Sequence, residues 1–282
     1  MKPLSHIKLL VTDLDDTLLS DDKTISARTV TALRRAKDQG ITLAFASGRI
    51  DFMMELYREP LVPCDYRIAF GGGSVRRVAD GHIDFVTPID ADATAAVWRL
   101  LADEFPQYVA YSWDHMYYRD DTESRILPRF DRYAELGATY GVELYHDRTK
   151  LAAGETVPEV YGDILKFVFY DDDSAHLAEF SKRVGRTVPG IDVEETGYGF
   201  TGIFEETVAK GNALRHLQEK LGIGPDRTCV FGDYDNDLSL FDAADHTVAV
   251  ANASETLKQV ARYITASNQD DGVAAFIERY IL

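Results

Sequence analysis

The chain has 282 residues, of which 45% are hydrophobic and 27% charged, and its formal net charge is −17 at pH 7. This composition is typical of a soluble globular protein, and the length allows one large domain or two of ordinary size. Such an acidic chain, with no local cluster of lysine and arginine, disfavours nucleic acids and anionic membranes as partners. No apolar run approaches the ~18 residues of a membrane span, and the N-terminal apolar stretch is too short for a signal peptide, so we expect a cytoplasmic protein.

The first 80 residues alternate between strands and helices. The predicted strands are three short apolar runs, at 6–12, 41–47 and 66–70. Between the first two, Ser26 is placed to cap a helix that Gly40 ends, and a shorter helix over 51–60 follows the second strand. Apolar strands separated by amphipathic helices are typical of a parallel sheet that is covered on both faces.

From residue 81 onward the predicted strands come in pairs with one polar face. The expected elements are a helix over 90–104, a strand pair over 108–120, a helix over 124–137, a strand over 163–170 and a helix over 174–184. This pattern predicts a separate α+β domain with a mostly antiparallel sheet over 81–190. The strands expected around 191–204 lead the chain back to the first domain.

The alternation of strand and helix then resumes and continues to the end of the chain. The expected elements are a helix over 208–221, a strand over 227–232, a helix over 236–244, a strand over 246–251 and helices over 254–265 and 272–281. Residues 1–80 and 191–282 are therefore predicted to form one α/β domain, into which the α+β domain is inserted.

Polar motifs follow three predicted strands of the α/β domain. They are DLDDT at 13–17, SGR at 47–49 and GDYDND at 232–237. Ligands of open α/β sheets bind beyond the carboxyl ends of the strands. If these strands are neighbours in a parallel sheet, the three motifs share one crevice.

Four of the acidic residues in these motifs are Asp13, Asp15, Asp233 and Asp237. Carboxylates a few ångströms apart raise one another's pKa, so they cannot all be ionised in one crevice without a counter-ion. A hard divalent cation such as Mg²⁺, which prefers oxygen ligands, meets this requirement. Each acid could instead be an ordinary helix cap or turn residue, but two such motifs at strand ends favour the metal site.

The other polar residues are suited to bind phosphate. Ser47 and the backbone amides of Gly48 and Arg49, at a predicted helix start, can hold anionic oxygens. Lys210 opens the helix that begins KGNAL, where a lysine opposes the helix dipole and is more often functional. The alternatives are an ordinary strand-to-helix turn for SGR and a solvated surface lysine for Lys210.

The motifs DLDDT, SGR, KGNAL and GDYDND occur in this order, with a long insertion after the second. As an ordered set they resemble the four signature motifs of the haloacid dehalogenase-like phosphohydrolases. The later stretches TVAVANAS and SNQDDGVAAFI are similar to the C-terminal part of the Cof-like subfamily. This resemblance spans essentially the whole chain and implies a Rossmann-like parallel-sheet core domain with an inserted α+β cap domain. It also implies a Mg²⁺-dependent phosphatase of small phosphorylated metabolites, with sugar phosphates expected.

The resemblance also implies roles for individual residues. Asp13 resembles the nucleophile that takes the phosphoryl group as an aspartyl phosphate, and Asp15 resembles the general acid/base. The implied Mg²⁺ ligands are Asp13, the main-chain carbonyl of Asp15, and Asp233, with support from Asp237. The implied phosphate-binding residues are Ser47, Gly48, Lys210 and Asn236, since fixed positive charge and donors stabilise the transferring phosphoryl group.

The chain departs from the family pattern at three positions. Asp16 stands where the family most often has glycine, and we expect the turn to persist because aspartate tolerates left-handed geometry. FGGGS at 70–74 replaces the usual Asn-Gly pair, and Ala251 replaces a usual glycine. In the insertion, several aromatic residues could stack on a sugar ring, although at strand spacing they more often belong to a core: Tyr108, Tyr111, Trp113, Tyr117 and Tyr118.

Two rival functions use the same acidic motifs. One is a phosphomutase resembling the phosphomannomutases, which returns the phosphoryl group to the substrate. The other is a non-catalytic, receiver-like phospho-acceptor or binding module, but this function leaves Asp15 and the insertion without a role. The expected partner is a small phosphorylated metabolite, and the protein is expected to be a monomer or a small homo-oligomer.

Overall fold

The computed structural model describes residues 4–58, 61–121, 123–144, 147–197 and 199–282. The chain divides into two compact units, a core unit of Met1–Val86 with Ala209–Leu282 and an inserted unit of Thr87–Val208. Each has its own sheet and its own buried apolar cluster.

The core unit is built on a sheet with strand order β14-β13-β12-β1-β2-β3-β4-β5. Its strands are β1 (Leu9–Asp13), β2 (Thr42–Ala46), β3 (Tyr66–Ala69), β4 (Ser74–Arg77), β5 (Ile83–Val86), β12 (Thr228–Gly232), β13 (His246–Ala249) and β14 (Tyr263–Ile264). From β14 to β3 neighbouring strands are parallel, whereas β3, β4 and β5 pair antiparallel. The predicted parallel α/β sheet is thus confirmed and gains two antiparallel strands at one edge.

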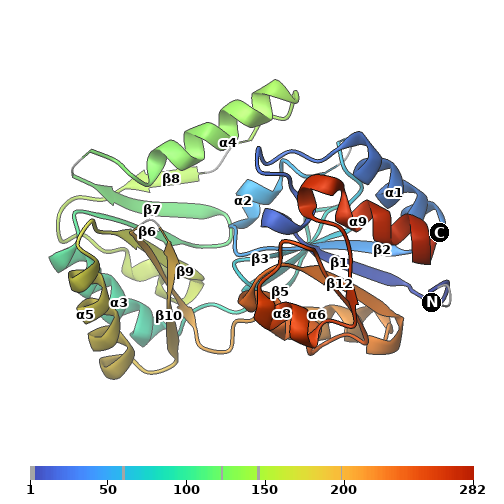
Figure 1. Cartoon of the computed structure of the whole chain (residues 1–282). Helices are drawn as coiled ribbons and strands as arrows, with labels where there is room; N and C mark the ends of the chain where they lie inside the picture. The colour runs from blue at the N-terminus through green and yellow to red at the C-terminus, as the bar shows by residue number, and fades with distance from the viewer. Residues whose placement is uncertain (1–3, 59–60, 122, 145–146, 198) are drawn as a thin grey trace. The chain divides into compact units, whose positions relative to one another are not determined.

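Helices cover both faces of the core sheet. They are α1 (Ala27–Asp38), α2 (Asp51–Met54), α6 (Lys210–Leu221), α7 (Leu238–Phe241), α8 (Glu255–Val260) and α9 (Gly272–Phe276). Figure 1 shows α1 and α9 on one face and α6 and α8 on the other. As predicted, the side chain of Ser26 caps α1, by accepting a hydrogen bond from the backbone N–H of Thr29. Residues 59–60 of the predicted helix over 51–60 lie outside the described residues.

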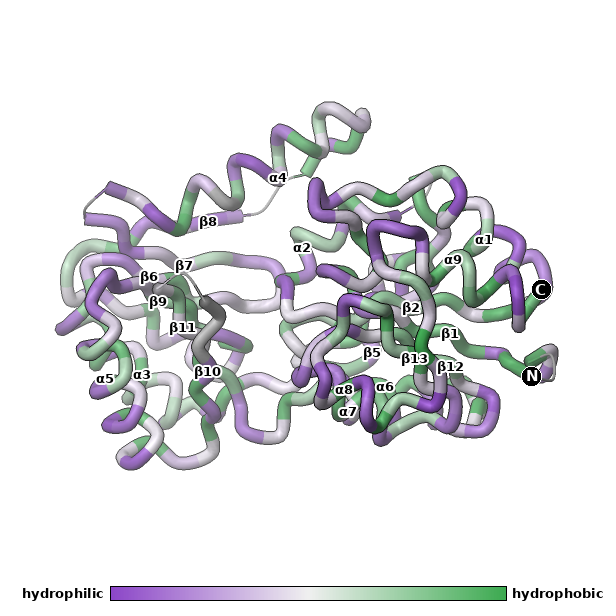
Figure 2. Tube along the Cα trace, viewed as in Figure 1, coloured by the Kyte–Doolittle hydropathy of each residue, from purple (hydrophilic) through white to green (hydrophobic). Residues whose placement is uncertain are grey.

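The central strands of the core unit are apolar on both faces because helices cover each face. Every residue of β1 and β12 is buried, and Figure 2 shows hydrophobic residues along these strands. On α6, Leu214 and Leu217 lie one turn apart and join the same apolar cluster as Val11 and Val230. Among the residues that the structure describes, no helix is both long enough and apolar enough to cross a membrane.

The inserted unit has a sheet with strand order β10-β11-β9-β6-β7-β8, antiparallel except for the pair β7–β8. Its strands are β6 (Gln107–Tyr111), β7 (His115–Asp120), β8 (Asp147–Lys150), β9 (Lys166–Tyr170), β10 (Ile191–Gly197) and β11 (Phe200–Glu205), and its helices are α3 (Ala91–Glu104), α4 (Leu127–Thr139) and α5 (Ser174–Thr187). Helices α3 and α5 cover one face, and α4 lies on the other side of the sheet (Figure 1). Of the predicted aromatic stripe, Tyr108 and Tyr117 pack in the core of this unit, whereas Trp113 is exposed.

The inserted unit begins and ends later in the chain than the predicted insertion over 81–190. Strand β5 belongs to the core unit because it pairs with β4, with Phe85 opposite Val75. Strands β10 and β11 belong to the inserted unit because β11 pairs with β9, with Ile203 opposite Phe167. Strand pairing is a long-range property, which a local change of pattern at residue 81 or 190 does not reveal. Tyr198, within the strands expected at 191–204, lies outside the described residues.

Candidate active site

The predicted polar motifs lie at one edge of the core sheet. Asp13 is the last residue of β1, Ser47 follows β2, and Asp233 follows β12. Strand β1 lies between the other two, with Thr12 opposite Phe231 and Asp13 opposite Ala46. These strands are parallel and adjacent, so their carboxyl ends meet at the same edge, which satisfies the condition under which the sequence analysis placed the three motifs in one crevice.

Three of the predicted metal ligands form a cluster at this edge. Carboxylate oxygens of Asp13, Asp233 and Asp237 all lie within 4.8 Å of one another. The Nζ of Lys210, at the start of α6, donates hydrogen bonds to Asp13 at 2.6 Å and to Asp237 at 2.7 Å. The lysine side chain is only 2% exposed, so it is part of the cluster and not a solvated surface residue.

The charges of this cluster do not balance. Burial raises the pKa of Asp13 well above its ordinary value, although the charge of Lys210 opposes this rise. Burial likewise raises the pKa of Asp233 to about 6. If all three acids are ionised, one ammonium faces three carboxylates, and a divalent cation would offset the excess of two negative charges. The all-oxygen donor set fits Mg²⁺.

Neighbouring groups orient the acids. The Asp237 carboxylate accepts the backbone N–H of Asp233 at 3.0 Å, and Thr17 Oγ1 donates to Asp233 at 2.7 Å. A Cβ on Gly232 would lie 2.6 Å from Asp237 Oδ2, so only glycine leaves room for this carboxylate. The sequence analysis did not identify Thr17 or Gly232 as site residues, although both stand within the quoted motifs.

The Asp15 carboxylate has different partners from the acid cluster. Arg49 donates two hydrogen bonds to it, from Nε at 2.7 Å and from Nη2 at 2.6 Å, and Lys23 Nζ lies 3.0 Å away. Burial by itself would raise the pKa of Asp15, but the hydrogen bonds and charge of Arg49, together with Lys23, outweigh it and lower the pKa. Asp15 is therefore a carboxylate held by two cations in this structure.

Tyr57 connects these two cations. Its hydroxyl accepts a hydrogen bond from Arg49 Nη1 at 3.0 Å and donates one to the backbone carbonyl of Lys23 at 3.1 Å. The Arg49 guanidinium also lies 5.3 Å from the centre of the Tyr57 ring. Sequence reasoning used only the backbone of Arg49 and missed Tyr57 and Lys23. The signal available was the arginine within SGR itself, but its partner could not be read from spacing.

The SGR turn is held by both backbone and side-chain hydrogen bonds. Its backbone bonds join it to β3 and the residue after it, from Ser47 N–H to the Ile68 carbonyl at 2.9 Å and from Phe70 N–H to the Arg49 carbonyl at 2.8 Å. Ser47 is buried, and its Oγ accepts the N–H of Arg49 at 3.2 Å, whereas Gly48 is exposed. The helix predicted after this turn begins at Asp51, as expected, but α2 is a single turn, so its dipole contributes little to anion binding at Gly48.

A buried ion-pair network lies directly after the SGR turn. Asp51 pairs with Arg67 of β3 at 2.9 Å and with Arg76 of β4 at 2.8 Å. Asp51 and Arg67 are almost fully buried, so loss of one partner would leave an uncompensated charge. The network fastens α2, and with it the SGR turn, to the β3–β4 hairpin. No sequence signal pointed to it.

The departures from the family pattern are accommodated locally. Asp16 has φ 57 and ψ 7, so it adopts the left-handed geometry that was expected of this position. Its carbonyl accepts a hydrogen bond from Asn252 Nδ2 at 2.7 Å, which ties the DLDDT turn to the TVAVANAS stretch. In the FGGGS turn, a Cβ on Gly72 would lie 2.2 Å from the carbonyl oxygen of Ala209, so this turn packs directly against the residue before Lys210.

Asn236 is not brought into the cluster. It lies in the short turn Asp235–Asp237, is exposed, and makes no side-chain hydrogen bond to the described residues. Its predicted part in phosphate binding therefore stays a prediction.

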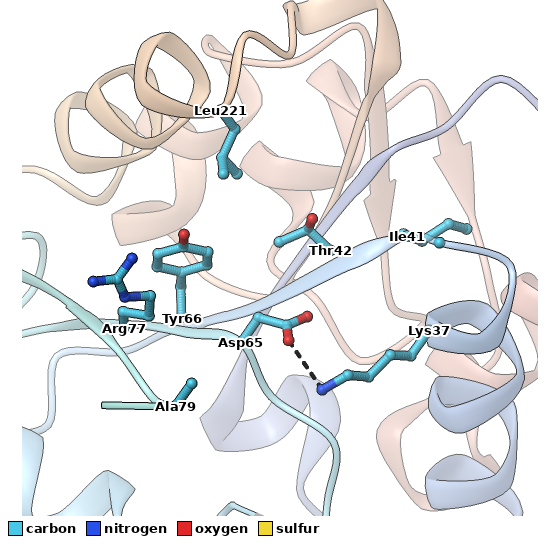
Figure 3. Close-up of a pocket in the computed structure, with 9 residues that line it drawn as sticks. Lys37, Ile41, Thr42, Asp65, Tyr66, Arg77, Ala79 and Leu221 are labelled. Atoms are coloured by element: carbon cyan, nitrogen blue, oxygen red, sulfur yellow. Dashed lines mark ion pairs between the residues drawn. The ribbon is translucent and has the colours of Figure 1, made fainter. Parts of the chain in front are cut away.

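A shallow pocket of about 380 Å³ lies at the opposite edge of the core sheet, near the first residues of β2 and β3. Figure 3 shows Tyr66, Thr42 and Leu221 around it, with the ion pair of Lys37 and Asp65, whose atoms are 2.9 Å apart. None of the predicted site residues lines this pocket. The acid cluster at the other edge is therefore the candidate active site.

Comparison with known proteins agrees with this geometry. The sequence model of a family described as haloacid dehalogenase-like hydrolase matches residues 10–277. The chain therefore belongs to the haloacid dehalogenase-like hydrolases. Within them it is a phosphatase of the Cof-like type, as the resemblance of its motifs implied.

Individual relatives align with almost the whole chain. A 5-amino-6-(5-phospho-D-ribitylamino)uracil phosphatase, YwtE of Bacillus subtilis (strain 168), is 27% identical over 296 residues, covering 98% of each chain. Pyridoxal phosphate phosphatase YbhA of Escherichia coli (strain K12) is 24% identical over 275 residues, covering 98% of this chain and 99% of its own. A haloacid dehalogenase-like hydrolase from Bacteroides thetaiotaomicron superposes with a TM-score of 0.80 at 24% identity, covering 97% of this chain and 99% of its own. This last likeness concerns the fold.

Proposed function

We propose that this protein is a Mg²⁺-dependent phosphatase that hydrolyses small phosphorylated metabolites by way of a phosphoryl group carried on Asp13. The observation that carries the proposal is the buried contact of Asp13 and Asp237 with Lys210, at 2.6 and 2.7 Å. Asp13 Oδ1 accepts a hydrogen bond from Lys210 Nζ, whereas Asp13 Oδ2 accepts no hydrogen bond from the described residues. That oxygen is left available to attack phosphorus.

Asp13, Asp233 and Asp237, with the main-chain carbonyl of Asp15, would hold the Mg²⁺ ion. When bound, the ion supplies positive charge for the phosphoryl oxygens and for the clustered carboxylates. Lys210 adds a fixed cation in the same buried place, where a charge is screened least. Ser47, at the end of β2, would donate from its hydroxyl to a phosphoryl oxygen.

The proposed reaction has two displacements. Asp13 Oδ2 forms a bond to phosphorus while the ester P–O bond breaks, and Asp15 gives its proton to the leaving alcohol. Water then attacks the same phosphorus, Asp15 takes a proton from it, and inorganic phosphate leaves with the regeneration of the Asp13 carboxylate. Because Arg49 and Lys23 hold Asp15 as a carboxylate, Asp15 must first take up a proton from solvent on one oxygen and turn that oxygen to the leaving alcohol, while its other oxygen keeps a hydrogen bond to Arg49.

The relatives support the substrate class. YwtE and YbhA are named as phosphatases of a phosphorylated ribityl compound and of pyridoxal phosphate, which are both phosphomonoesters of small metabolites. We extend this to the present chain as a class, with sugar phosphates and related phosphomonoesters as the first compounds to examine. A single substrate does not follow from these names.

The test is release of inorganic phosphate from a panel of phosphorylated metabolites, with millimolar Mg²⁺ or with EDTA. We expect Mg²⁺-dependent turnover of at least one compound, and its loss in Asp13→Asn, since an amide neither attacks phosphorus nor binds Mg²⁺ well. Asp38→Asn, at an exposed position at the end of α1, is the matched control. Asp13→Asn activity within tenfold of wild type would refute the nucleophile role. Phosphoryl transfer without phosphate release would indicate the phosphomutase, and phosphorylation without turnover the phospho-acceptor.

A further inference from the structure

Two histidines meet at the edge of the core sheet opposite the acid cluster. His6 precedes β1, and His246 is the first residue of β13. Their Nε2 atoms are 3.1 Å apart, and Nε2 of His246 is also 3.1 Å from the carbonyl oxygen of Asp226. At ~3.3 Å per residue, β1 alone places about 13 Å between this pair and Asp13. The pair is therefore separate from the proposed phosphatase site.

The hydrogen bonds of the pair leave one ring nitrogen without a partner. Only one proton can lie between the two Nε2 atoms, and the Asp226 carbonyl requires that His246 carry it. Nδ1 of His246 is then an unprotonated acceptor, and it is buried with no hydrogen-bond partner among the described residues. A metal ion that binds Nε2 of His246 takes the place of this proton, which moves to Nδ1 of the same ring, so the ring remains the neutral imidazole that binds metal ions.

A charged pair lies beside His246. The His246 side chain is 6% exposed, and the charged groups that act on its ring from neighbouring positions include Arg262 and Asp245. Arg262 is the cation that opposes a bound metal here. Its guanidinium lies over the ring of Tyr263 and donates to the Asp245 carbonyl at 3.1 Å. Asp245 partly offsets its charge.

We propose that His6 and His246, with the Asp226 carbonyl, form a binding site for a divalent transition-metal ion such as Zn²⁺ or Cu²⁺. Imidazole nitrogens bind such ions at about 2.0–2.1 Å, so nitrogens 3.1 Å apart reach one ion at an angle of about 100°. This angle lies between the tetrahedral and square-planar values, so neither ring has to move far. His6 is exposed, which leaves the remaining positions to water.

The ligand chemistry separates this site from the acid cluster. Imidazole favours Zn²⁺ and Cu²⁺, whereas the oxygen set of Asp13, Asp233 and Asp237 suits Mg²⁺. An ion at the histidines would join two residues 240 positions apart. It would tie the segment before β1 to β13 and thereby stabilise the folded core unit by mass action.

The test uses the untagged full-length protein saturated with Mg²⁺, so that the acid cluster is occupied. Cu²⁺ is added, and its electron paramagnetic resonance spectrum is examined for hyperfine coupling to imidazole nitrogen. Zn²⁺ is then titrated calorimetrically and by thermal unfolding. We expect nitrogen coupling in wild type, a rise of the unfolding midpoint with Zn²⁺, and at least about tenfold weaker binding in His6→Gln.

His6 is exposed, so His6→Gln should fold normally, and this variant decides the question even if the buried His246→Gln does not fold. His82→Gln, at another exposed histidine of the core unit, should bind both ions as wild type does. A Cu²⁺ spectrum with oxygen ligands only would overturn the proposal, as would undiminished affinity in His6→Gln. Phosphatase activity is not part of the readout, so failure here is distinct from failure of the proposed function.

Discussion

Lys210 is the residue on which the charges of the candidate site depend. Its side chain is 2% exposed, and those of Asp13 and Asp237 are 7% and 0% exposed. Burial would lower the pKa of this lysine, but the two carboxylates outweigh burial and raise it. Removing one partner from a buried ion-paired cluster lowers the unfolding free energy by much more than the whole cluster contributes to it.

Lys210→Ala should therefore destabilise the metal-free core unit as well as impair catalysis. We expect a loss of about 3–5 kcal/mol in unfolding free energy, because two buried carboxylates lose their cation. Urea unfolding in EDTA measures this, with the exposed Lys182→Ala as control. A loss below about 1 kcal/mol would mean that the carboxylates take up protons or water without the lysine.

A second single-residue prediction concerns Arg49 and the orientation of Asp15. Arg49→Met removes both hydrogen bonds that Arg49 donates to the Asp15 carboxylate. If Arg49 positions the general acid/base, kcat should fall by about 10²-fold or more, with little change in KM. Tyr57→Phe, which removes only the hydroxyl that supports Arg49, should show a smaller effect in the same direction. If the unfolding free energy of Arg49→Met falls by as much as its activation free energy rises, Arg49 has a structural role alone.

At the scale of elements, the inserted unit contains an ionisable contact between α5 and the residue that follows β9. His176 Nδ1 lies 2.6 Å from an oxygen of Asp171, and its ring stacks on Phe105 at 5.2 Å between centroids. The hydrogen bond to Asp171 raises the pKa of His176, burial opposes the rise, and the charges of Asp171 and Glu104 add to it. The histidine is 39% exposed, so solvent screens the contact.

The sign of the resulting pH dependence follows from this raised pKa. The contact stabilises the inserted unit fully below the unfolded pKa of about 6.5, and the stabilisation is lost as pH rises through the higher folded pKa. NMR titration of the His176 ring should give a pKa above that of an unfolded histidine. Asp171→Asn should lower it. An unchanged value in Asp171→Asn would show that the aspartate is not the partner in solution.

At the scale of the whole molecule, the net charge of −17 and the uncompensated acid cluster make the fold sensitive to divalent cations. A ligand that binds only the native state stabilises it by mass action, by about 2.7 kcal/mol at a hundredfold excess over Kd. Millimolar Mg²⁺ should therefore raise the melting midpoint of the core unit relative to EDTA. The rise should shrink in Asp233→Asn. Identical midpoints with and without Mg²⁺ in wild type would argue against a metal site in the acid cluster.

Much of this protein could be predicted from local sequence. The apolar strands, the Ser26 cap, the ordered motifs and the α/β character of the core unit all depend on short stretches whose side chains dictate local geometry. The adjacency of Asp13, Ser47 and Asp233 was predictable only on the condition that their strands are neighbours, because neighbouring parallel strands present their carboxyl ends at one edge. For Asp13, Asp233 and Asp237, residue type and position together predicted a shared cation site.

Tertiary structure alone decided the partners that lie far apart in the chain. Nothing in the spacing of SGR shows that Arg49 holds Asp15, that Tyr57 supports Arg49, or that Asp51 pairs with Arg67 and Arg76. The true limits of the inserted unit also depended on the pairing of β5 with β4 and of β11 with β9. Local sequence specifies which residues can donate a hydrogen bond, accept one or carry charge. The partner of each such residue depends on how the strands and helices pack, which is a property of the whole fold.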